Sequence, residues 1–306
     1  MANSSLLTLF QHALQGMGVQ SYGQPTTIVG NTNQDITQML ALINMEADSQ
    51  AREHEWQAQR IQYNFSAATY SYTGTTTTDS ANVTGMSSIT GLGTTFMLTG
   101  TGVPQDTFVT EATGTTVTMN RAATASGTGT FTFSQVLFSF PTGYDRPVDR
   151  TQWDKSKHWE MLGPETPQQM EWLRSGYIST GPRIRFIDMG GYFMIWPPLG
   201  SAESLSYEYQ SKYWIVATGA TTPTKQYFTV DTDTCIFPDA LMHALIRLKY
   251  FEIKGFDTTA LYRDYIKQLD LAKSYDAGNR TLSMAPRLAD VLIGWENIPD
   301  SNYGSN

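Results

Sequence analysis

The sequence predicts an α+β fold: a helical body, made of N-terminal helices and a C-terminal antiparallel helix pair, with an antiparallel β-sheet and an inserted all-β module. Three observations lead to this prediction. Apolar residues recur every three or four positions near both ends of the chain, which is the period of a helix face. They alternate with polar residues in the middle of the chain, which is the period of a strand. A segment rich in Thr, Ser and Gly interrupts the alternating region.

Two helices are predicted before residue 60. The first ends where glycines become frequent, at Gly16 and Gly18. The second begins after Thr32 or Asn33, either of which can cap it, and Asp35 lies in its first turn, where the helix dipole favours a negative charge. The apolar positions of the two helices are Leu7, Phe10, Leu14 and Met17, then Ile36, Met39, Leu40, Ile43, Ala47 and Ala51.

The composition changes sharply between residues 73 and 133. Only four of these 61 residues are charged, and 34 are Thr, Ser or Gly. A low-complexity linker and a small β module both fit, because Thr favours strands and Gly favours turns. The apolar residues alternate, as at Phe131 and Phe133, which favours the module. Alternation at 61–65 and 136–140 predicts two neighbouring strands of one sheet, with the module inserted at the tip of their hairpin.

The remaining elements follow in order along the chain. Three more strands form a meander, and they span 183–187, 192–196 and 205–209. A helix opens at Pro238 and ends at Gly255, and a second helix ends at Gly278. Because about four residues join these helices, we expect them to lie antiparallel.

These elements divide the chain into three parts. Residues 1–70 and 136–280 form one core of helices and a β meander, residues 71–135 form the inserted module, and residues 281–306 form an extended C-terminal docking tail. The tail is expected to dock because it holds many large apolar residues. They are Leu288, Val291, Leu292, Ile293, Trp295 and Ile298.

Composition excludes several classes of function. Charged residues are 16% of the chain, against about 25% in typical domains, so much of the surface is expected to face other protein. The net charge of −8 gives no basic surface for gripping nucleic acid. No apolar run approaches the roughly 18 residues of a membrane helix, and the first residues lack the basic region of a signal peptide. We therefore expect no membrane partner and synthesis inside the cell.

No catalytic, cofactor or metal site is predicted. Cys235 is the single cysteine, so a disulfide within the chain and a cysteine zinc cluster are both excluded. None of the four histidines has another at metal-ligand spacing. The run from Asp231 to Asp233 suits a polar turn better than a calcium loop, because no full set of ligands follows it.

Four residues are candidates for a subunit or tail interface. Trp153 and Trp159 suit an interface or a core, since tryptophan is enriched at interfaces, although they would also suit sugar stacking beside a carboxylate pair. Arg183 and Arg185 share one side of a predicted strand. With a net charge of −8, we expect this pair to meet carboxylates of a neighbour rather than phosphates.

Three stretches of the chain resemble the head-to-tail adaptor, or connector, proteins of tailed bacteriophages. The first is TNQDITQMLALIN at 32–44, preceded by the Leu-rich opening helix and followed by Trp56. The second joins RIRF at 183–186, IWPP at 195–198 and LSYEYQSKYWI at 205–215. The third is the terminal helix pair. Together they cover most of 1–70 and 134–280, whereas residues 98–125 resemble a small β domain that recurs in phage virion proteins and that plain adaptors lack.

The resemblance implies a non-enzymatic structural role in the neck of a virion, after synthesis in the cytoplasm of a bacterial host. Such adaptors form a homo-oligomeric ring, commonly twelve-fold, beneath the portal protein. The ring extends the DNA channel, so contact with genomic DNA is transient, and it offers a docking surface to tail nozzle, fibre or spike proteins. The C-terminal segment reaches the portal, which assigns the portal contact here to Arg287, Leu288, Val291, Leu292, Ile293 and Trp295.

Two other classes of function remain open at this stage. A tail-associated peptidoglycan-degrading enzyme would use Asp154 or Glu160 near Trp153 and Trp159. A carbohydrate-binding virion protein would act through the β module at 71–135.

Overall fold

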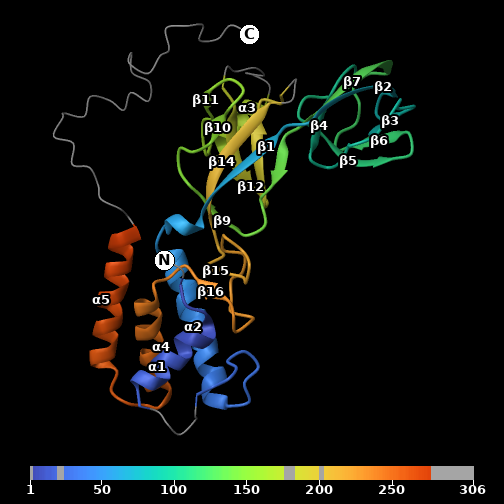
Figure 1. Ribbon diagram of the computed structural model, residues 1–306. Helices are drawn as coiled ribbons and strands as arrows, with labels where there is room; N and C mark the ends of the chain where they lie inside the picture. The colour runs from blue at the N-terminus through green and yellow to red at the C-terminus, as the bar shows by residue number, and fades with distance from the viewer. Residues whose placement is uncertain (1–2, 19–23, 176–182, 200–202, 277–306) are drawn as a thin grey trace, which may run out of the picture.

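The computed structural model describes residues 3–18, 24–175, 183–199 and 203–276, and Figure 1 shows three parts. A bundle of helices lies at one end, two sheets lie in the middle, and a β-barrel projects to one side (Figure 1). The helices are α1 (Leu6–Gly16), α2 (Gln34–Glu53), α3 (Pro167–Arg174), α4 (Asp239–Ile253) and α5 (Thr259–Asp276), with a short 3₁₀ turn at Gln57–Gln59.

The bundle consists of α1, α2, α4 and α5, with α4 packed against the other three. The Ser5 hydroxyl accepts a hydrogen bond from the Thr8 N–H and so caps α1. The predicted cap of α2 is confirmed at Asn33, whose side chain accepts from the Asp35 N–H at 2.9 Å. Gly255 follows α4 with a φ of 71°, in the left-handed region that favours glycine at a helix end.

The middle part is a sandwich of two antiparallel sheets. One sheet has the order β1-β14-β10-β11, with β9 also on β14, and the other has the order β12-β13-β8. Phe193 of β13 and Tyr207 of β14 stack across the two sheets with ring centroids 5.1 Å apart, so the sheets share one apolar core. The strands are β1 (Arg60–Ser66), β8 (Leu137–Ser139), β9 (Tyr144–Pro147), β10 (Trp153–Asp154), β11 (Trp159–Glu160), β12 (Arg185–Met189), β13 (Tyr192–Trp196) and β14 (Ser204–Ser211).

The Thr-rich segment folds into a closed antiparallel barrel of six strands, in the order β2-β3-β6-β5-β4-β7. Phe131, Phe133 and Leu98 fill its interior. Gly102 allows a tight turn with a φ of 73°, because a Cβ atom there would lie 2.2 Å from the Ala125 carbonyl oxygen. The strands are β2 (Thr69–Thr76), β3 (Asn82–Thr84), β4 (Phe96–Thr99), β5 (Thr107–Thr113), β6 (Thr116–Met119) and β7 (Gly127–Gln135).

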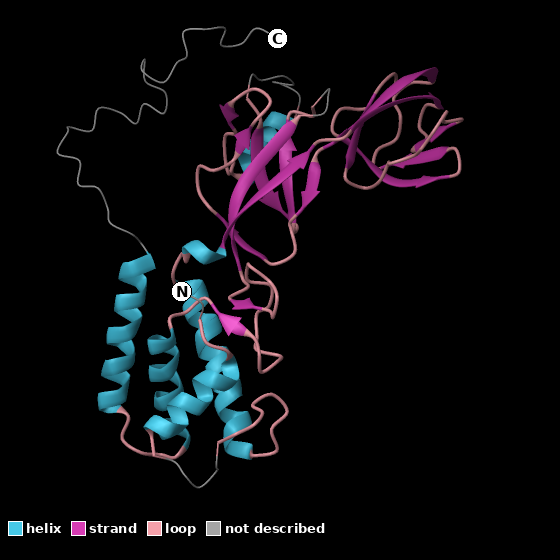
Figure 2. Cartoon of the chain, viewed as in Figure 1, coloured by secondary structure: helices cyan, strands magenta, loops and turns pink. Residues whose placement is uncertain are grey.

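The fold class predicted from the sequence is wrong. About 30% of the chain is strand and 29% is helix, and the strands form a closed barrel and several sheets rather than one sheet on a helical body (Figure 2). The prediction missed much of the strand content because many strands are too short to show a period: β10, β11, β15 (Ile215–Val216) and β16 (Thr234–Cys235) have two residues each.

The predicted pairing of 61–65 with 136–140 is also wrong. Residues Arg60–Ser66 pair with β14 in one sheet, whereas Leu137–Ser139 pair with β13 in the facing sheet. The alternation identified both strands but not their partners, because pairing depends on contacts distant in sequence. The barrel therefore joins two sheets and does not extend a hairpin.

Candidate interaction surfaces

Trp153 and Trp159 lie on the short hairpin β10–β11. Trp153 lies opposite Glu160, and Asp154 lies opposite Trp159. Trp159 is 42% exposed, whereas Trp153 is half-buried. Of the two tryptophans, Trp159 therefore presents the larger surface to a partner.

The two carboxylates weighed for a hydrolase, Asp154 and Glu160, cannot flank one bond. Residues directly opposite each other in an antiparallel pair share a face, and neighbours in a strand point to opposite faces. The register therefore places Asp154 and Glu160 on opposite faces of the hairpin. Asp154 is buried and accepts hydrogen bonds from the N–H groups of Ser156 and Lys157 at 2.9 and 3.0 Å, which holds a turn.

The structure instead brings Asp154 close to Glu203, which sequence reasoning missed. Burial raises the pKa of Glu203 above its ordinary value, and the Asp154 carboxylate adds to this rise. The Lys157 ammonium, 2.7 Å from Glu203, opposes it. No sequence signal could have shown this pair, because about fifty residues separate its members.

The two arginine candidates have different environments. Arg185, in β12, makes an ion pair with Glu165, so an internal carboxylate already neutralises it. Arg183 precedes β12 and is exposed. Of the predicted pair, Arg183 is the residue whose side chain is open to a partner.

Large apolar side chains are exposed along the hairpin of α4 and α5. Tyr275 is 81% exposed. Figure 1 shows α5 at the outer edge of the bundle. The exposed large apolar residues of this hairpin are Phe256, Tyr262, Leu271 and Tyr275. Leu271 and Tyr275 lie about one turn apart on one side of α5, whereas Tyr262 lies on the side opposite Leu271. We call Leu271 and Tyr275 the α5 patch.

The barrel presents a different kind of surface. Residues 69–135 are all described, and none of them is an exposed large apolar residue. Its outer face on β2 and β7 carries cross-strand pairs of hydroxyl residues, such as Thr73 with Thr130 and Thr75 with Thr128. The barrel therefore lacks the aromatic anchors that dominate most protein interfaces.

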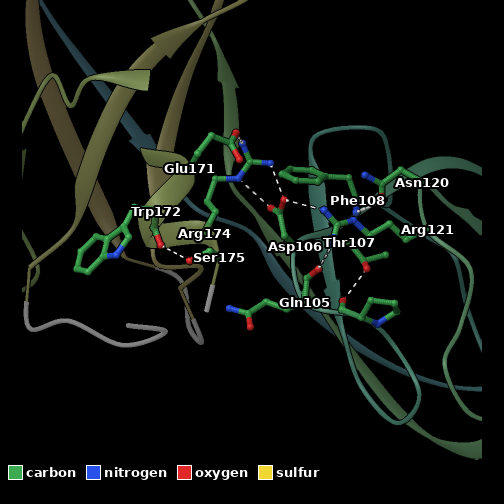
Figure 3. Close-up of polar contacts among 11 residues, drawn as sticks. Gln105, Asp106, Thr107, Phe108, Asn120, Arg121, Glu171, Trp172, Arg174 and Ser175 are labelled. Atoms are coloured by element: carbon green, nitrogen blue, oxygen red, sulfur yellow. Dashed lines mark hydrogen bonds and ion pairs between the residues drawn. The ribbon is translucent and has the colours of Figure 1, made fainter. Parts of the chain in front are cut away.

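A charged contact joins the barrel to the sandwich. The guanidinium of Arg174, in α3, binds both carboxylate oxygens of Asp106, at 2.8 and 2.9 Å (Figure 3). The same guanidinium lies 5.4 Å from the ring centroid of Phe108, and Arg121 lies 3.7 Å from Asp106. The side chains of Arg174 and Asp106 are each 12% exposed, so the pair is shielded from water.

Apolar contact reinforces this junction. Met97, on the outer side of β4, belongs to the core of the sandwich, and Phe108 packs against that core. Beside it lies an uncharged cleft of about 370 Å³. The cleft is lined by Met97, Thr99, Gly100, Val103, Pro104, Gln105, Trp196 and Pro198. The barrel is thus held in one orientation rather than attached only by its two connecting chains.

The cysteine and histidine residues considered as catalytic or metal-binding groups lie in surroundings that favour a structural role. Cys235 is buried, and burial raises the pKa of its thiol to about 12, which keeps it protonated. Burial lowers the pKa of His243, which lies against His12 with ring centroids 6.0 Å apart. Among the described residues, no three His, Cys, Asp or Glu side chains are grouped closely enough to hold a metal ion.

Asp231 and Asp233 bind protein groups. Asp231 accepts from the N–H groups of Ile28 and Val29 at 3.0 and 2.8 Å, and the Lys225 ammonium lies 2.8 and 2.9 Å from the two oxygens of Asp233. Because N–H groups bind Asp231 and the Lys225 ammonium binds Asp233, the two carboxylates hold this turn in place.

The predicted portal residues, from Arg287 to Trp295, lie outside the described residues. In the part of the chain that is described, no helix combines the length and apolar character needed to cross a bilayer. No family model matches this chain, and no curated protein matches it significantly.

Proposed function

We propose that this chain is a head-to-tail adaptor of a tailed bacteriophage, a structural subunit that forms a ring with its copies. The ring lies beneath the portal, extends the DNA channel and docks the tail. The stretches that resemble adaptors fall on α2, on β12 to β14 and on the α4–α5 hairpin, which belong to the bundle and the sandwich. The barrel is an addition to that arrangement.

The observation that carries the proposal is the α5 patch. Two large apolar side chains in water, one turn apart on one side of a helix, are typical of a surface that another protein covers. A closed ring needs two different faces on each subunit, because every contact joins the front of one copy to the back of the next. We assign the α5 patch to one of these faces.

The low and negative charge of the chain supports the proposal that DNA passes through the ring. With few charged residues and a net charge of −8, the ring would not bind the DNA that passes through it. The proposed partners are further copies of this chain, twelve in the ring by resemblance to adaptors, the portal through Arg287 to Trp295, and tail proteins through Trp159 or Arg183. The proposed location is the neck of the virion.

The α5 patch provides the test. Leu271→Ser with Tyr275→Ser should leave a folded chain that no longer forms rings with portal, observed by electron microscopy of the mixture and by sedimentation velocity. Tyr192→Ser, at an exposed tyrosine of β13 outside the patch, is the matched control and should assemble normally. Normal rings from the double variant, or clearing of peptidoglycan by the purified chain, would overturn the proposal.

A further inference from the structure

The cleft at the junction of the barrel and the sandwich has two walls of different origin. Residues of β4 and of the loop that follows it form the barrel wall. Trp196, the last residue of β13, and Pro198 form the sandwich wall. The cleft volume of about 370 Å³ lies in the lower part of the range of small-molecule sites, which is about 300–1,000 Å³. The cleft therefore suits a ligand with one or two rings.

Hydrogen bonds within the barrel fix the loop of the barrel wall. The Thr124 N–H donates to the Gly102 carbonyl oxygen at 2.8 Å. The Arg121 guanidinium donates to the Gln105 carbonyl oxygen at 3.1 Å. Because these contacts already order the backbone, a ligand would bind without the entropic cost of ordering it.

The two walls are also held against each other. The Thr69 hydroxyl of β2 donates to the carbonyl oxygen of Leu199, the residue after Pro198, at 3.0 Å. The Arg174 guanidinium binds Asp106, which directly follows the barrel wall in the sequence. The junction therefore sets the distance between the walls, and the cleft is part of the fold.

The charge of the walls restricts the ligand. None of the eight described residues that line the cleft is charged. The neighbouring Asp106 carboxylate already has ion pairs with Arg174 and Arg121. A charged ligand would lose hydration on entry and gain no ion pair, which is costly. The cleft therefore favours a neutral ligand.

The walls also carry hydrogen-bonding groups. Trp196 is 2% exposed, and its indole N–H has no acceptor within the described part of the chain. A buried donor without an acceptor is costly, so an acceptor oxygen at this wall would stabilise it. Gln105 is exposed, and Figure 3 shows its side chain extending from the barrel loop toward the sandwich. Thr99 adds a hydroxyl group, so a purely apolar ligand would not match these walls.

The remaining side chains of the walls are aliphatic. They belong to Met97, Val103, Pro104 and Pro198. Because the Trp196 ring is covered, it offers no open aromatic face on which a nucleobase could stack. A pyranose ring fits both kinds of group, since it has C–H groups on its faces and hydroxyl groups around its edge.

We propose that this cleft binds a neutral saccharide of one or two pyranose rings. The ring faces pack on the two prolines, and the sugar hydroxyls pair with Gln105, Thr99 and the Trp196 N–H. The site needs the barrel and the sandwich together, because each supplies one wall. It goes beyond the adaptor function and does not depend on it.

NMR titration of the full chain tests the site with six sugars: glucose, galactose, N-acetylglucosamine, maltose, lactose and N,N′-diacetylchitobiose. At least one sugar should shift the indole N–H signal of Trp196 and the methyl signal of Met97 saturably, because both residues line the cleft. The methyl signal of Met45, exposed on α2, should stay unchanged. If none of the six sugars shifts the Trp196 and Met97 signals at tens of millimolar, the proposal is wrong.

Variants of the cleft wall locate the binding. Thr99→Trp should fill the cleft and abolish the shifts, whereas Thr130→Trp should bind like the parent chain. Thr130 is the matched control because it is also an exposed threonine of the barrel but does not line the cleft. Gln105→Ala should weaken binding about fivefold, since it removes one hydrogen-bonding side chain and keeps the carbonyl oxygen that Arg121 binds. Unchanged binding by Thr99→Trp or by Gln105→Ala would refute the assignment.

A charged form of the sugar that binds tests the neutrality of the site. Its uronic acid, which carries a carboxylate, should bind at least about tenfold more weakly, because the cleft has no cation to pair with it. Equal affinity for the neutral sugar and its uronic acid would contradict the proposal.

Discussion

The bundle and the barrel differ in how far they bury their large apolar side chains. The bundle leaves Phe256, Tyr262, Leu271 and Tyr275 in water, whereas the barrel exposes no large apolar side chain. The barrel also closes on itself, so it has no strand edge, whereas β1 of the sandwich lies at the edge of its sheet among the described residues. The difference teaches that the barrel buries its large apolar side chains without a partner, whereas the bundle leaves several exposed among the described residues.

Replacing Phe131 by Ala should break the barrel and leave the bundle intact. Phe131 is fully buried at the centre of the barrel, and such a truncation costs about 3–5 kcal/mol. Hydrogen exchange should accelerate for the amides of β2 and β7 and stay unchanged in α4. Equal acceleration in both regions would show that the barrel does not unfold as a separate unit.

Replacing Asp233 by Ala should have the converse effect and weaken the bundle by about 3 kcal/mol. Burial alone would raise the pKa of Asp233, but the Lys225 ammonium and the N–H groups of Thr229 and Val230 lower it below its ordinary value. Asp233 therefore stabilises the fold above about pH 4 and loses this effect as the pH falls through its lowered pKa. Chemical denaturation at pH 7 and pH 3 should show a smaller difference between variant and parent at pH 3.

Replacing Arg174 by Ala should uncouple the two regions at a cost of about 2 kcal/mol, because Asp106 loses its bidentate partner. Small-angle X-ray scattering should then show a wider range of barrel orientations. Glu171→Gln is the control, since Glu171 is exposed and binds only the outer side of the same guanidinium. Unchanged scattering from Arg174→Ala would show that Met97 and Phe108 suffice to orient the barrel.

Replacing Tyr275 by Ser should have the smallest effect on stability, within about 0.5 kcal/mol, because the side chain is exposed. Self-association measured by sedimentation velocity should nevertheless fall. Thr130→Val, on the outer face of the barrel, should change neither property. An equal loss of association from both substitutions would remove the contrast between the two surfaces.

Local signals in the sequence located several elements well. Asn33 caps α2 as its position before an apolar period predicts, and Gly255 ends α4. The alternation at Phe131 and Phe133 predicted strand, and both residues fill the barrel. Each of these features depends on neighbours within a few positions, so the sequence contains enough information to predict it.

The contacts between regions were not predictable in this way. Asp106 is one of only four charges between 73 and 133, which was a signal that it had a partner, but nothing in the sequence pointed to Arg174. The α5 patch was missed because a helix period shows which side can be buried and not which side lacks a neighbour.

The sequence by itself therefore determined the helices, the strand character of the Thr-rich segment and the shortage of charge, since backbone propensity and side-chain period act locally. Tertiary structure alone decided that β1 pairs with β14, that the strands form a closed barrel and two facing sheets, and that Arg174 holds Asp106. Each of these contacts joins residues that lie tens to more than a hundred positions apart in the sequence. They depend on which surfaces can exclude water together, and no window of the sequence contains both sides of such a contact.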